Sequence, residues 1–164
     1  RSDYHSGTTW SLKGDTPEVK ATGKRFGLNM ISAVSAKGHM KFTTVQGRIN
    51  GDVFIDFLKK MVSDCERPVY LIVDGHPMHK SKKVKKYVES TEGFLKLFFL
   101  PPYSPELNPD ELVWGHLKYH GIGKLVINTK TELVSQVRSH LRSLQRKPEI
   151  IKGFFRKPSL QYAA

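Results

Sequence analysis

The chain lacks the features that mark secreted and membrane proteins. It contains one cysteine, Cys65, so it can form no intrachain disulfide and has no zinc-ribbon spacing. No stretch of it approaches the roughly 18 consecutive apolar residues of a membrane-spanning helix. The polar start RSDYHSG is unlike a signal peptide. We therefore expect a protein of a reducing, cytoplasmic interior that has no membrane partner.

Acidic residues are also scarce. The 164 residues include 27 Lys and Arg but only 15 Asp and Glu, which gives a formal net charge of +12. Such an excess of positive charge favours polyanionic partners through long-range steering and counterion release. The hydrophobic content of 38% is that of an ordinary globular protein, and the length fits one domain with its own core. Composition therefore favours a single globular domain, residues 1–164, with nucleic acid as the obvious polyanion.

The hydrophobic pattern predicts an α/β fold in the order β-β-α-β-α-β-α-α. The predicted strands are 25–34, 39–45, 69–73 and 95–100, and the predicted helices are 52–62, 80–89, 108–119 and 129–146. The first two strands flank an AKG turn and should form a hairpin. The last two strands are unbroken apolar runs, a pattern typical of strands that are buried on both faces. Thr129 and Glu132 form a capping-box pattern, which opens a C-terminal helical extension over about 129–160.

Two carboxylates are placed where chemistry could occur. Asp74 directly follows the strand 69–73, and Glu111 lies in the first turn of the helix that follows the next strand. The chain between them holds one helix and one strand, so both side chains can reach the same edge of the sheet. Carboxylates favour Mg²⁺ or Mn²⁺, which take oxygen ligands. Two such ions can activate a nucleophile and stabilise the leaving oxygen in phosphodiester transfer.

Simpler roles for these residues stay open. Asp74 can cap a turn, and Glu111 can complete a capping box with Asn108 as N-cap. Asp110 competes with Glu111 as the ligand, because helix geometry does not separate neighbouring side chains at this range.

Histidines offer a rival metal site. His116 and His120 are spaced i,i+4 on a predicted helix, as zinc ligands often are, and His76 and His79 follow Asp74. The chain has neither an H-E-x-x-H motif nor a cysteine near these histidines, so zinc is the weaker hypothesis.

Basic residues gather in two groups that could contact phosphates. Lysines cover one side of the helix 80–89, and arginines form an i,i+4 stripe on the last helix. A charged run is usually a solvated face, but the first group starts only a few residues after the first carboxylate. The candidate nucleic-acid-binding residues are His79, Lys80, Lys82, Lys83, Lys118, Arg138 and Arg142.

The segment FFLPPYSPELNPDELVWGHLK closely resembles the third-carboxylate motif of DDE-superfamily transposases, most nearly the bacterial insertion-sequence branch related to the Tc/mariner elements. VYLIVDGHPMHKSKKV is similar to the segment around that family's second Asp, and TWSLKG with TGKRFGLNMISAVSAKG resembles its first hairpin. The resemblance implies that Asp74 is the second catalytic acid and Glu111 the third.

The same resemblance implies a fold, an activity and partners. The fold would be ribonuclease H-like, a mixed five-stranded sheet in the order 3-2-1-4-5 with helices on both faces. The activity would be DNA transposition, with metal-dependent strand cleavage and strand transfer and with two Mg²⁺ or Mn²⁺ ions. The partners would be terminal inverted repeats, target DNA and a second copy in a homodimer. The location would be the bacterial cytoplasm, in association with the nucleoid.

One departure from the family pattern concerns the first acid. In the family, the first catalytic Asp lies on the central strand, upstream of the segment resembling RSDYHSGTTW, and Asp3 falls in the loop after that strand. We therefore expect this chain to be inactive as it stands. A strand-wide gap should lie between the hairpin and the strand 69–73 unless the N-terminal residues fill it. A ribonuclease H-like nuclease or resolvase and a non-catalytic DNA-binding module remain as alternatives.

Overall fold

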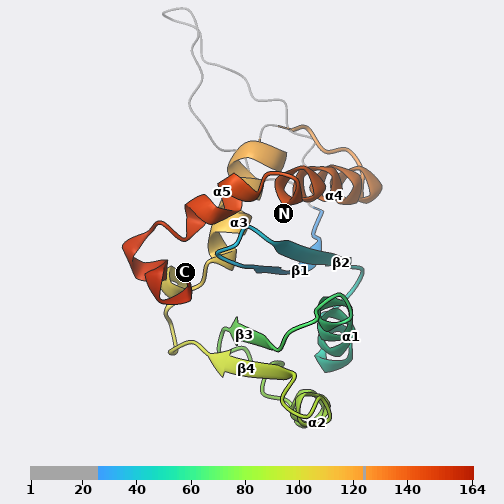
Figure 1. Ribbon diagram of the computed structural model, residues 1–164. Helices are drawn as coiled ribbons and strands as arrows, with labels where there is room; N and C mark the ends of the chain where they lie inside the picture. The colour runs from blue at the N-terminus through green and yellow to red at the C-terminus, as the bar shows by residue number, and fades with distance from the viewer. Residues whose placement is uncertain (1–25, 124) are drawn as a thin grey trace, which may run out of the picture.

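β1 (Asn29–Val34) and β2 (Met40–Val45) form the predicted antiparallel hairpin in a computed structural model that describes residues 26–123 and 125–164 (Figure 1). The TWSLKG segment and Asp3 lie outside the described residues. Gly38 in the hairpin turn has a φ of +86°, a conformation that glycine adopts without steric cost. A Cβ at this position would lie 2.7 Å from the Cβ of Pro148, so glycine allows the turn to approach the C-terminal helices.

α1 (Gly51–Val62) and α2 (Lys82–Glu89) begin at side-chain caps. The Asn50 side chain accepts a hydrogen bond from the backbone N–H of Val53, which satisfies one of the free donors of the first turn. Ser81 caps α2 in the same way. α1 buries one apolar stripe, which comprises Phe54, Phe57, Leu58 and Met61. These two helices pack against each other; α2 also packs against β4, and α1 also packs against β2.

β3 (Val69–Val73) and β4 (Leu95–Phe99) form a parallel pair. One face of this pair packs in the same apolar cluster as α1 and α2. The prediction that both strands are buried on both faces was wrong for the described chain. On the opposite face Tyr70 is 62% exposed and Phe98 is 50% exposed. Among the described residues each of these strands has one paired neighbour, and the face opposite α1 and α2 opens onto a hollow that η1 and η3 border.

The remaining elements are helical. They are η1 (Pro105–Leu107), α3 (Asp110–His116), the π-helix η2 (Leu117–Ile122), α4 (Lys130–Gln145), α5 (Pro148–Phe154) and η3 (Pro158–Ala163). α3 begins after Pro109, so the expected N-cap at Asn108 was wrong by one residue. Thr129 caps α4 by accepting from the N–H of Glu132 at 3.1 Å, as the capping-box pattern predicts. No helix in the described part of the chain is long and apolar enough to cross a membrane.

Two apolar clusters hold these layers together. The first joins one face of the hairpin to α3, η2, α4 and α5, and it includes the fully buried Leu141 and Ile151. The second joins α1, α2, β3 and β4 around Leu58 and Leu95. Each such buried side chain contributes about 1.5–3 kcal/mol to stability. β1 contributes to both clusters through its alternating side chains, so it is the element that connects them.

The two strand pairs do not form one sheet. Among the described residues, β1 pairs only with β2 and β3 pairs only with β4, as the expected gap requires (Figure 1). The free edges of β1 and β3 line the same cavity, which has a volume of about 1180 Å³. We call this cavity the central slot; residues 29–36 line one side of it and residues 70–74 the other. The described chain therefore confirms the prediction that the hairpin and the strand 69–73 do not pair.

Candidate active site

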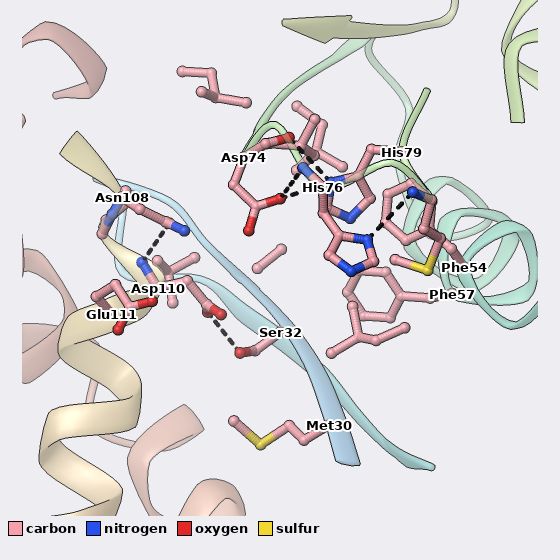
Figure 2. A pocket seen from close by; sticks show the side chains of 18 of the residues that line it. Met30, Ser32, Phe54, Phe57, Asp74, His76, His79, Asn108, Asp110 and Glu111 are labelled. Atoms are coloured by element: carbon pink, nitrogen blue, oxygen red, sulfur yellow. Dashed lines mark hydrogen bonds and ion pairs between the residues drawn. The ribbon is translucent and has the colours of Figure 1, made fainter. Parts of the chain in front are cut away.

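Three carboxylates line the central slot. Asp74 directly follows β3, and Asp110 and Glu111 form the first turn of α3 (Figure 2). The fold thus brings together residues that are distant in the sequence, as expected from the carboxyl end of a parallel strand.

Asp74 is held by the loop that follows it. Its Oδ1 accepts a hydrogen bond from the backbone N–H of His76 at 3.0 Å and lies 3.0 Å from Nδ1 of His79. His79 is partly buried and packs against Phe54, with 4.5 Å between the ring centroids. Burial lowers the pKa of His79, and the nearby Asp74 opposes that shift. His79, expected on the phosphate path, therefore contacts Asp74 and orients its carboxylate (Figure 2).

Asp110 and Glu111 differ in their surroundings although they are neighbours. Asp110 accepts a hydrogen bond from the Ser32 hydroxyl of β1 at 2.6 Å, and its N–H donates to the Asn108 side chain at 3.0 Å. Burial raises the pKa of Asp110 to about 7; the Ser32 hydrogen bond opposes the rise, and the charges of Glu111 and Asp74 add to it. Glu111 is exposed. The structure thus directs Asp110 to β1 and leaves Glu111 exposed at the slot.

The chemistry of these donors fits a hard divalent cation. Carboxylate oxygens are the ligands that Mg²⁺ and Mn²⁺ take, and a cation would offset the repulsion from Glu111 and Asp74, which adds to the effect of burial on the pKa of Asp110. Within residues 26–123 and 125–164, however, no group of three or more His, Cys, Asp or Glu side chains is arranged to hold a metal ion. The described chain therefore places carboxylates on two sides of the slot, but these residues alone do not form a complete metal-binding site.

The basic candidates lie in different settings. Lys83 forms an ion pair with Asp52 at 2.9 Å, and Arg138 donates to the Thr44 hydroxyl at 2.7 Å. Lys80 lies near an aromatic ring of β4, 5.3 Å from its centroid. The remaining candidates are exposed: Lys82, Lys118 and Arg142. They lie on α2, η2 and α4, so the structure does not gather the candidate cations at one place.

A histidine pair joins two of the C-terminal helices. Nδ1 of His116 lies 3.0 Å from Nε2 of His140, and the ring of His120 lies 4.7 Å from that of His116. Gly121 allows this approach, because a Cβ there would lie 2.9 Å from the His140 ring. Sequence analysis paired His116 with His120 but missed His140. No sequence signal marked it, because the contact depends on how the π-helix packs against α4.

We expect the contribution of His116 to stability to fall as the pH is lowered from 6.5 towards 4. Burial, followed by the charges of His140, His120 and Lys147, lowers the pKa of His116 from 6.5 to about 4. In this window the unfolded chain therefore binds a proton that the folded chain does not bind, and stability present above pH 6.5 is lost.

Urea unfolding of the wild type and of His116→Gln at pH 7 and pH 5 tests this expectation. The variant should lose less stability between the two pH values. The raised pKa of Asp110 acts in the opposite direction in both proteins, so it cancels in the comparison. Equal losses in the two proteins would contradict the prediction.

Comparisons with known proteins agree with this architecture. Residues 1–134 match the family model described as DDE superfamily endonuclease. The structure also resembles a chain of the Mos1 mariner paired end complex with Mn, with a TM-score of 0.59 and 13% identity over 96% of this chain and 51% of that chain. This likeness confirms the expected ribonuclease H-like fold class.

The chain belongs to the DDE superfamily endonuclease family. It is also similar to the insertion element IS630 uncharacterized 39 kDa protein of Shigella sonnei, with 28% identity over 114 residues. That match covers 68% of this chain and 33% of the relative. The chain thus spans about a third of that relative and about half of the matched mariner chain. These findings confirm the family resemblance of the two carboxylate segments.

Proposed function

We propose that the chain is part of the catalytic domain of a DNA transposase, with Asp74 and Glu111 as two of its catalytic acids. The observation that carries this proposal is the placement of Asp74 and the first turn of α3 on one cavity, in a member of the DDE superfamily endonuclease family. The reaction would be cleavage of a DNA phosphodiester bond followed by transfer of the freed 3′ end to target DNA.

Divalent ions, Mg²⁺ or Mn²⁺ and two in the intact enzyme, would supply an activated nucleophile and a counter-charge for the leaving oxygen. Asp74 and Glu111 would hold them. Backbone and side-chain contacts from His76 and His79 fix the Asp74 carboxylate before any ion binds. The Ser32–Asp110 hydrogen bond fixes the first turn of α3 against β1, so it also sets the position of the Glu111 backbone.

The partners would be the terminal inverted repeats of an element and a target DNA, bound by a homodimer at the bacterial nucleoid. The net charge of +12 suits a polyanion of this kind.

The chemistry is tested in the extended protein, by which we mean this chain preceded by a strand that supplies the family's first acid. Incubated with Mg²⁺ or Mn²⁺ and DNA ending in the inverted repeat, it should cut the repeat and join it to a second duplex. Cleavage of branched DNA without joining would instead indicate a resolvase.

We expect DNA binding to weaken steeply with salt and to depend little on sequence. Replacing Lys82 by Gln should lower the slope of log affinity against log salt by about one, because each lost phosphate contact releases one counterion fewer. Arg142→Gln should act in the same way. Lys83→Gln is the matched comparison on the same helix, and its smaller effect would follow from the ion pair with Asp52. Fluorescence anisotropy at several salt concentrations measures the slopes, and an unchanged slope in Lys82→Gln would assign that side chain to solvent.

A further inference from the structure

The face of β3 and β4 that points away from α1 and α2 carries aromatic side chains beside lysines. The parallel register places Tyr70 next to Lys96 and Ile72 next to Phe98. Tyr70 and Phe98 are at least half exposed, and Ile72 is 37% exposed. An apolar surface of this kind on a sheet is unusual unless it has a binding partner.

Rings and lysines lie close to one another on this face and at the end of β4, where Phe99 lines the same hollow. The centroids of Tyr70 and Phe98 lie 6.0 Å apart with an interplanar angle of 52°. The Nζ atom of Lys96 lies 5.8 Å from the Tyr70 centroid, and that of Lys80 lies 5.3 Å from the Phe99 centroid. Neither lysine forms an ion pair with another residue of the described chain. Both ammonium groups are therefore available to an anion that lies over the rings.

A hollow of about 500 Å³ extends from these rings towards η1 and η3, with Leu107 and Tyr162 on its far side. Its volume falls within the roughly 300–1,000 Å³ typical of small-molecule sites. Its walls are almost entirely apolar or aromatic side chains. Such walls can contact the flat apolar face of a ligand, but they form no hydrogen bonds with its polar groups. They therefore suit ligands that share a flat apolar face and differ in their hydrogen-bonding groups.

We propose that this face is a stacking platform for the unpaired bases of single-stranded DNA, with Lys96 and Lys80 on the phosphates. Every base has a π-face, so stacking on aromatic side chains tolerates any sequence, and lysines beside the rings follow the backbone. A protein partner fits less well, because lysine is depleted at the cores of protein interfaces.

The platform lies beside the proposed active site. Tyr70 and Tyr162 line both the hollow and the central slot, and Asp74 follows the strand that carries Tyr70. A strand separated from its complement could therefore reach from the platform to the carboxylates. The inference rests on the proposed function in its choice of DNA as the polymer, but binding to the platform requires neither metal nor cleavage.

Fluorescence anisotropy with EDTA present tests the platform without catalysis. The probes are a labelled oligothymidine and an oligonucleotide of the same length that lacks bases, so that they differ only in stacking. Tyr70→Leu combined with Phe98→Leu keeps an apolar face and removes the rings. It should weaken oligothymidine binding at least about fivefold and leave binding of the base-free probe unchanged. Lys96→Gln should weaken both probes. Tyr119→Leu, an exposed tyrosine on η2, is the matched control and should change neither.

Several results would overturn the platform. Equal affinity of the wild type for the two probes would show that only phosphates are bound, and so would an unchanged affinity of the double variant. A dimer in size-exclusion chromatography that Phe98→Asp converts to a monomer, with oligothymidine binding unchanged, would assign the face to a second protein chain. The outcomes for the two proposals remain separate. If the extended protein cuts DNA with metal but binds both probes equally, only the platform is refuted. If it binds oligothymidine more tightly than the base-free probe but cuts no DNA, only the transposase function is refuted.

Discussion

Asp74→Asn should abolish metal-dependent strand cleavage by the extended protein while leaving its fold intact. The substitution removes one anionic oxygen with almost no change of shape, and the hydrogen bond from the N–H of His76 can be retained. We expect a loss of at least about 100-fold, the size of effect seen when one fixed charge-stabilising group is removed from an active site. Single-turnover cleavage of labelled inverted-repeat DNA in Mg²⁺ and in Mn²⁺ measures it, and circular dichroism checks the fold.

Glu111→Gln should have an equally large effect, and Asp110→Asn is its matched control. The two carboxyl groups are adjacent, but the Asp110 carboxyl is already hydrogen-bonded to Ser32 of β1, whereas Glu111 is exposed at the slot. Retained cleavage in Asp74→Asn or in Glu111→Gln would refute the assignment. If Asp110→Asn is the inactive variant instead, the third acid lies one residue earlier than proposed.

A strand that fills the central slot should stabilise the protein strongly. We expect the chain by itself to be marginally stable or prone to aggregate, because β1 and β3 each have one edge without a partner strand among the described residues, and open edges invite pairing with other chains. Each new backbone hydrogen bond contributes about 0.5–1.5 kcal/mol net, so a strand paired on both edges should add at least about 3 kcal/mol. For a domain of this size, that gain raises Tm by about 6–12 °C.

Differential scanning calorimetry of the chain and of the extended protein measures this gain. The control extension has the same composition with its apolar alternation shifted by one residue, which turns its apolar side chains to the wrong face. It should stabilise much less. A cooperative unfolding transition at high temperature for the chain alone would show that the slot needs no additional strand.

Local chemistry made most of the elements predictable. The run 69–73 and the capping box of Thr129 and Glu132 depend on neighbouring residues, and the structure has both where the sequence places them. Features that depend on distant contacts were less accessible. The exposure of Tyr70 follows from the hollow that η1 and η3 border, which no pattern within the strand reveals. The different environments of Asp110 and Glu111 depend on a hydroxyl of β1, far away in the chain. His140 likewise meets His116 only through packing.

The Ser32–Asp110 hydrogen bond has a further consequence for how the acids are spaced. It attaches the first turn of α3 to β1, whereas Asp74 belongs to the separate pair of β3 and β4. The carboxylates on the two sides therefore belong to different strand pairs, and the separation between them depends on the width of the slot. A spectroscopic distance measurement between one label on α3 and another on the loop after β3 would give that width directly. A strand that joins β1 to β3 in one sheet would then also set the distance between the carboxylates at which they bind metal.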